Sequence, residues 1–181
     1  MQGQGMQGNM QGQGMMQGRG NGQGMQGQGM QGPTAENMEL HLPAKSATAP
    51  TTAVIAAMKD GIADEQNAYA AYAEIIEQLG EVAPFTNIQR AEAHHIDAWS
   101  FLFDRYGLDV PKAQAATSTV KYASVTEACE AAAKVERDNI TLYDDMLDTV
   151  KNYPDMVQIV TSLRTASLER HLPALEQCAG Q

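Results

Sequence analysis

Apolar residues recur at intervals of three and four in four stretches of the chain, a spacing typical of amphipathic helices. The first predicted helix has Thr51 or Thr52 as its N-cap, after Pro50, and ends at Gly80. Its inner face carries Met58, Ile62, Glu65, Tyr69, Tyr72, Ile76 and Leu79. One acidic residue therefore lies in the middle of an otherwise apolar and aromatic stripe.

The second predicted helix follows Pro84, has Thr86 as its N-cap and ends before Gly107. Its inner face carries Ile88, Glu92, His95, Trp99, Leu102 and Tyr106. Glu92 and His95 are three residues apart, so they share a helix face and can reach one metal ion together. Burying them is costly unless they are paired or bound to a metal. A core histidine satisfied by a neighbouring carboxylate is the alternative.

The third predicted helix opens with the capping-box sequence Ser124-Val125-Thr126-Glu127. Its inner face again contains an ionisable residue, as the stripe reads Val125, Cys129, Ala132, Glu136, Asn139, Tyr143, Met146, Val150. The preceding connector, residues 107–123, is long enough to cross the full length of a bundle.

The fourth predicted helix begins near Pro154, a residue favoured in the first turn. Its later inner face carries Leu168, His171, Leu175 and Cys178. Pro173 lies inside this helix, so we expect a lost backbone hydrogen bond and a kink beside His171.

Four helices aligned side by side would bring the buried polar residues to about one level. Three carboxylates there would repel one another strongly in a medium of low dielectric constant, and a cation removes that cost. We therefore predict a metal site formed by Glu65, Glu92, His95, Glu136 and His171. The alternative is a polar core whose members share protons.

Together these segments resemble the ferritin-like superfamily of di-iron and di-manganese carboxylate bundles, and most closely an uncharacterised prokaryotic ferritin-like domain family. The resemblance extends from about Asp64 to Ala174. It rests on Asp64-Glu65, Phe85-Thr86-Asn87-Ile88, Glu92-Ala93-His94-His95, Asp104-Arg105-Tyr106-Gly107-Leu108, Glu136 and His171-Leu172. It implies an all-α, ferritin-like four-helix bundle with a long crossover between helices 2 and 3.

By the same resemblance, Glu65 would be a terminal ligand, Glu92 and Glu136 would bridge, and His95 and His171 would each bind one metal. The superfamily carries a second E-x-x-H pair on its fourth helix, but Leu168 stands at that Glu position here. Asn139, one turn after Glu136, is a further candidate ligand. The expected cofactor is one or two divalent ions, iron first, with manganese or zinc as alternatives. No catalytic residue is predicted, and whether the chain is an enzyme stays open.

The two cysteines have matched positions. Cys129 lies seven residues before Glu136, and Cys178 lies seven residues after His171. If the third and fourth helices are antiparallel, both cysteines reach one height on the inner face, so we predict a disulfide, with two buried thiols as the alternative. A disulfide favours an extracellular or cell-surface location after signal-peptide removal; a cytoplasmic location is the alternative.

Composition divides the chain into three parts. Residues 1–32 consist almost wholly of Gly, Gln and Met and form a low-complexity arm, and residues 33–50 are an Ala/Thr/Pro-rich connector. Only residues 51–181 are expected to fold as a domain. The net charge of −10 disfavours nucleic acid and anionic membranes as partners, and no apolar run is long enough to span a membrane.

Two functions of different classes follow. In the first, a secreted ferritin-like subunit assembles into a filament or other polymer because residues 1–32 lie extended along another subunit, where Gly permits close backbone approach and Met fills grooves. In the second, the protein is a di-iron oxidase or a metal-storage protein, and the arm is a flexible tail. Since Met thioethers are soft ligands, a copper-binding arm is a further alternative.

Overall fold

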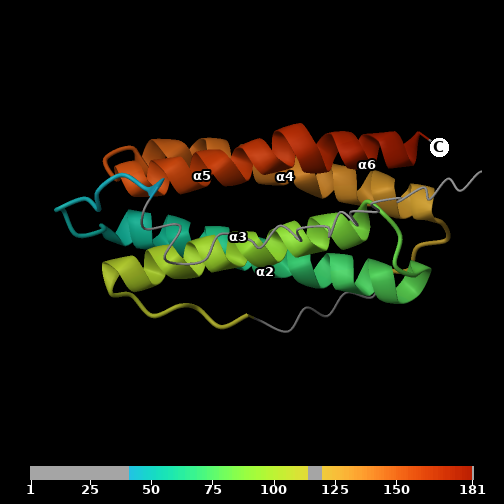
Figure 1. The fold of residues 1–181 in the computed structure, drawn as a ribbon, viewed down its shortest axis with the longest axis horizontal. Coiled ribbons are helices and arrows are strands. Elements are labelled where there is room, and N and C mark those ends of the chain that lie inside the picture. The colour runs from blue at the N-terminus through green and yellow to red at the C-terminus, as the bar shows by residue number, and fades with distance from the viewer. Residues whose placement is uncertain (1–40, 114–119, 181) are drawn as a thin grey trace, which may run out of the picture. The chain divides into compact units, whose positions relative to one another are not determined.

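The computed structural model describes residues 41–113 and 120–180, and within these ranges it contains helices and no strand (Figure 1). Three of the four helical columns are α2 (Thr52–Leu79), α3 (Phe85–Tyr106) and α4 (Val125–Val150). The fourth column consists of α5 (Pro154–Ala166), the π-helix η1 (Ser167–His171) and α6 (Leu172–Ala179). The all-α prediction is confirmed for these residues. The predicted arm, residues 1–32, lies outside them.

Helices α2 and α3 run antiparallel, and so do α4 and the α5–η1–α6 column (Figure 1). Residues 108–113 leave α3 at one end of the bundle, whereas residues 120–124 enter α4 at the other end. As a result α4 is parallel to α3 and antiparallel to α2. This connection brings the middles of all four columns to the same level.

Local capping chemistry sets most helix ends. The Thr51 side chain accepts a hydrogen bond from the Val54 N–H at 3.3 Å, and Gly107 ends α3 in the left-handed region, at a φ of 68°. Ser124 caps α4 by accepting from the Glu127 N–H at 3.1 Å. The predicted Thr86 cap is wrong: α3 already begins at Phe85, because the Thr86 N–H donates to the backbone carbonyl of Val82.

The apolar core has two clusters, and the buried polar residues other than Asp155 lie between them in each column. One cluster contains Met58, Ile62, Trp99, Leu102, Tyr143, Met146 and Met156. The other contains Ala68, Ile75, Phe85, Ile88, Cys129, Ala132 and Leu175. A polar layer is thus enclosed by apolar packing above and below.

Two predicted inner-face residues lie at the surface instead. Tyr69 is 41% exposed and Leu168 is 38% exposed, while Ala68 and Ser167 occupy the buried positions beside them. In α2 the apolar face drifts around the helix because the helical period is 3.6 residues. In the fourth column the π-helix changes the register.

That π-helix stands where the sequence predicted a kink. The Leu172 N–H donates to the carbonyl of Ser167, five residues earlier, which is the π-helical bond. Pro173, which has no N–H, follows directly. The wider turn places Ser167 and His171 on the buried face, both under 5% exposed.

Candidate metal centre

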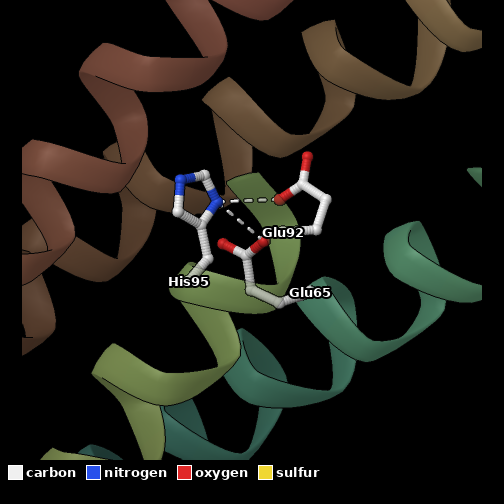
Figure 2. Close-up of side chains that lie close together, drawn as sticks. All are labelled: Glu65, Glu92 and His95. Atoms are coloured by element: carbon white, nitrogen blue, oxygen red, sulfur yellow. Dashed lines mark hydrogen bonds and ion pairs between the residues drawn. The ribbon is translucent and has the colours of Figure 1, made fainter. Parts of the chain in front are cut away.

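Helix α3 supplies two side chains at the middle of the polar layer. Nδ1 of His95 lies 2.7 Å from Oε2 of Glu92 in the same helix and 3.1 Å from Oε2 of Glu65 in α2 (Figure 2). The three side chains converge on one point between the two helices. Glu65 and Glu92 are each 1% exposed, so this convergence takes place away from water.

A second convergence joins α3 to the other two columns. Nδ1 of His171 lies 3.2 Å from Oε1 of Glu92 and 3.5 Å from Oε1 of Glu136. The rings of His95 and His171 are stacked, with centroids 5.5 Å apart. Glu92 therefore offers one carboxylate oxygen to each histidine.

The five predicted residues form two overlapping groups that could hold a metal ion. In each group the ligand atoms lie within 4.8 Å of one another; the groups are Glu65, Glu92, His95 and Glu92, Glu136, His171. Within residues 41–113 and 120–180, no other set of three or more His, Cys, Asp or Glu side chains is as close. Glu136 lies in only one group, so Glu92 alone is shared.

Residues 58–175 match the family described as an uncharacterised protein domain, DUF2202. The chain belongs to the DUF2202 family. The matched stretch contains the whole candidate centre and covers most of the bundle. No curated protein and no solved structure matches this chain.

The buried atoms of this DUF2202 domain fit a cation. Oε2 of Glu136 is buried without a hydrogen-bond partner, and Oε1 of Glu92 and Nδ1 of His171 are buried 3.2 Å apart without the geometry of a hydrogen bond. Unpaired buried lone pairs are costly, and carboxylate oxygens and imidazole nitrogens are suitable ligands for divalent metals. A metal ion would therefore satisfy buried lone pairs for which the described residues provide no hydrogen bond.

The ionisation of the centre shows how strongly it is coupled. Burial raises the pKa of Glu65 to about 8, in spite of the opposing hydrogen bond with His95. Burial acts to lower the pKa of His95, but its hydrogen bond and charge interaction with Glu65 outweigh this and raise the pKa to about 10. The pKa of His171 is raised to about 9 because Glu136 and Glu92 outweigh burial. Without a metal ion, these shifts favour the protonated forms of Glu65, His95 and His171.

Glu92 behaves in the opposite way. Burial acts to raise its pKa, yet the interactions with His171 and His95 prevail and hold the pKa well below its usual range. Glu92 is thus the carboxylate that stays ionised. This is the property expected of a ligand shared by two positions.

Sequence reasoning did not single out Asp64. Its Oδ2 atom is buried without a hydrogen-bond partner, and burial, together with the charges of Glu92 and Glu136, raises its pKa to about 7. Asp64 belongs to neither ligand group. In the sequence, only its position beside Glu65 pointed to Asp64. Adjacent residues of a helix point in different directions, so this position did not predict a side chain near the centre.

Asn139 is the remaining candidate ligand. Asn139 is 4% exposed and lies on the same face of α4 as Glu136. Leu168 and Glu169 are exposed, so neither position contributes to the buried layer. The buried residue one turn before His171 is Ser167.

The predicted disulfide is present. It joins Cys129 of α4 to Cys178 of α6, with Cα atoms 5.9 Å apart. The bond ties α4, which carries Glu136, to the column that carries His171. Among the described residues, no helix has both the length and the apolar character needed to cross a membrane.

Proposed function

We propose that this DUF2202 domain is a ferritin-like bundle that binds two divalent metal ions. The observation that carries the proposal is the pair of buried ligand groups sharing Glu92. One ion would be held by Glu65, Glu92 and His95, and the other by Glu92, Glu136 and His171. Four helices, a long connection before α4 and ligands at mid-height in every column support the ferritin-like assignment.

Charge balance supports two ions. Three ionised Glu carboxylates and two neutral His side chains carry a charge of −3, and two divalent cations leave +1. Asp64, whose charge interacts with Glu92 and Glu136, brings the sum to zero when it ionises. Carboxylate and imidazole ligands suit iron and manganese, and an iron pair would supply redox chemistry at this buried position.

Metal analysis of the native protein tests this proposal. We expect two ions per chain, and expect Glu92→Ala to remove both because both groups contain Glu92. Glu130→Ala, an exposed carboxylate on α4, is the matched control and should retain both ions. Native protein that holds no metal and takes up no Fe²⁺, Mn²⁺ or Zn²⁺ would overturn the proposal.

We further propose that the subunit assembles through residues 1–32. The supporting observation is that the last part of the connector, residues 43–49, is attached to the bundle. Lys45 Nζ donates to the backbone carbonyl of Arg105 at 2.6 Å, and the Ser46 N–H donates to the Tyr106 hydroxyl at 3.3 Å. The Tyr153 hydroxyl donates to the carbonyl of Ala49 at 3.0 Å.

The buried carboxylate of Asp155 contacts the two α3 residues that hold this segment. Asp155 is fully buried, accepts a hydrogen bond from the Tyr106 hydroxyl at 2.8 Å and lies 3.0 Å from Nε of Arg105. Arg105 in turn donates to the carbonyl of Pro43 at 3.0 Å. Residues 43–49 are thereby attached to the end of α3, so an arm bound to another subunit would be connected to the bundle through a fixed segment.

Deletion of residues 1–32 tests assembly separately from metal binding. We expect the truncated chain to stay helical and bind metal but to lose the filaments or other polymers that the full chain forms, as seen by negative-stain microscopy. A truncated chain that assembles unchanged would exclude the arm as connector and leave the oxidase or metal-storage function. The disulfide is in keeping with a proposed extracellular or cell-surface location.

A further inference from the structure

Two buried tyrosines donate hydrogen bonds to carboxylates of the candidate centre. The Tyr72 hydroxyl donates to Oε1 of Glu136 at 2.8 Å, and the Tyr143 hydroxyl donates to Oε1 of Glu65. Tyr72 is 3% exposed and Tyr143 is fully buried. Each bond crosses from one helix to another, since Tyr72 and Glu65 lie on α2 whereas Tyr143 and Glu136 lie on α4.

The two bonds are reciprocal. Tyr72 follows Glu65 by seven residues in α2, and Tyr143 follows Glu136 by seven residues in α4. Seven residues make about two helical turns, so each tyrosine shares a face with the Glu of its own helix. Because α2 and α4 are antiparallel, each tyrosine reaches the Glu of the opposite helix (Figure 1).

The carboxylates that receive these bonds keep an oxygen directed elsewhere. Glu65 accepts from Tyr143 through Oε1 and faces His95 through Oε2. Oε2 of Glu136 is buried and has no hydrogen-bond partner.

We propose that Tyr72 and Tyr143 are positioning residues, one for each metal position. Tyr143 orients Glu65 for the position formed with Glu92 and His95. Tyr72 orients Glu136 for the position formed with Glu92 and His171. This assignment rests on the proposed two-metal function and specifies which hydroxyl serves which ion.

Two variants that each lack one histidine, His171→Ala and His95→Ala, are the backgrounds in which the assignment is tested. Co²⁺ absorption is the probe. In His171→Ala, only the Glu65 position keeps its histidine; there Tyr143→Phe should lower Co²⁺ affinity by about 10- to 100-fold, and Tyr72→Phe should leave it unchanged. In His95→Ala the two tyrosines should exchange roles. Tyr106→Phe, which removes a hydroxyl bonded to Asp155 instead, is the matched control and should leave Co²⁺ affinity unchanged in both backgrounds.

If a histidine variant fails to fold, the assignment can still be tested with single tyrosine variants that keep both histidines. Tyr72→Phe and Tyr143→Phe should each reduce the number of tightly bound Co²⁺ ions from two to one. Two tight ions in both variants, or equal losses at both positions in the two histidine backgrounds, would overturn the assignment and make the tyrosines packing residues. Wild-type protein that binds no Co²⁺ would instead overturn the two-metal function, so the two failures are distinguishable.

Discussion

The indole ring of Trp99 occupies the space where a side chain at position 61 would stand. A Cβ atom on Gly61 would lie 2.7 Å from Cε2 of Trp99, well inside van der Waals contact, and 3.1 Å from the methyl carbon of Met146. Trp99 is fully buried in the cluster next to the polar layer. Gly61 therefore lets α2 approach α3 closely, one turn before Glu65.

Gly61→Ala should destabilise the protein by about 1–3 kcal/mol, because a large buried ring must move to admit the new methyl group. The free energy of unfolding from denaturant titration measures this effect. Gly180→Ala is the control, since its Cβ atom would make only ordinary contacts, the nearest at 3.5 Å. An unchanged unfolding midpoint for Gly61→Ala would contradict the close packing of α2 on α3.

The metal-free protein should lose stability as the pH rises from 7 to 10. His95 and His171 have folded-state pKa values of about 10 and about 9 against a usual value of 6.5. Their contribution is therefore complete below about pH 6.5 and disappears as the pH passes the folded-state values. Glu65, raised to about 8, acts in the same direction, since its ionisation in the folded core is unfavourable.

Melting temperatures measured with a chelator across this pH range test the prediction. His95→Gln should flatten the curve, whereas His94→Gln, at the partly exposed neighbouring position, should not. Metal binding should show the opposite dependence, because a metal ion competes with protons for the same ligands and gains affinity as the pH rises. If the melting temperature measured with chelator does not depend on pH, the predicted coupling of His95 and His171 to the buried carboxylates is wrong.

Leu168→Glu should leave the number of bound metal ions and their affinity unchanged. It would restore the E-x-x-H spacing with His171, yet the Leu168 side chain is 38% exposed and does not belong to the buried polar layer. Ser167→Glu is the informative comparison, because position 167 is buried. Isothermal titration with Mn²⁺ measures both variants, and tighter binding by Leu168→Glu would mean that the π-helix is not maintained.

The disulfide should contribute a large part of the free energy of unfolding of the bundle. Cys129 and Cys178 are 49 residues apart, and closing a loop of this length contributes roughly 4 kcal/mol in the chain-entropy model. The double variant Cys129→Ala/Cys178→Ala should lose about that free energy of unfolding. The wild type treated with reductant should show the same loss. Free thiols in freshly isolated protein would contradict the bond and the location inferred from it.

Sequence pattern predicted the helices well where the determining chemistry is local. Thr51, Gly80 and Gly107 mark helix ends because a side-chain cap or a glycine conformation acts within a few residues. The apolar stripe brought all the proposed ligands to the inner faces. These are properties of single helices, and each can be read without knowing what packs against them.

The sequence predictions failed where a shift of one residue changes the helix face that a side chain occupies. Leu168 was placed inside because an α-helical period was assumed across a stretch that is π-helical. The division of five ligands into two groups, with Glu92 shared and Glu136 in one group only, depends on how the columns pack together. The same holds for the tyrosine bonds, whose partners are more than sixty residues apart.

The two ligand groups differ in which helices must pack together before each group can form. Glu65, Glu92 and His95 all belong to the hairpin made by α2 and α3, so that hairpin contains one entire ligand group. The other group joins Glu92 to Glu136 and His171 and exists only once the second hairpin has closed on the first. If the proposed ions bind, the first position takes all its ligands from one hairpin and only the hydrogen bond of Tyr143 from the other, whereas an ion in the second position requires both hairpins to have packed together.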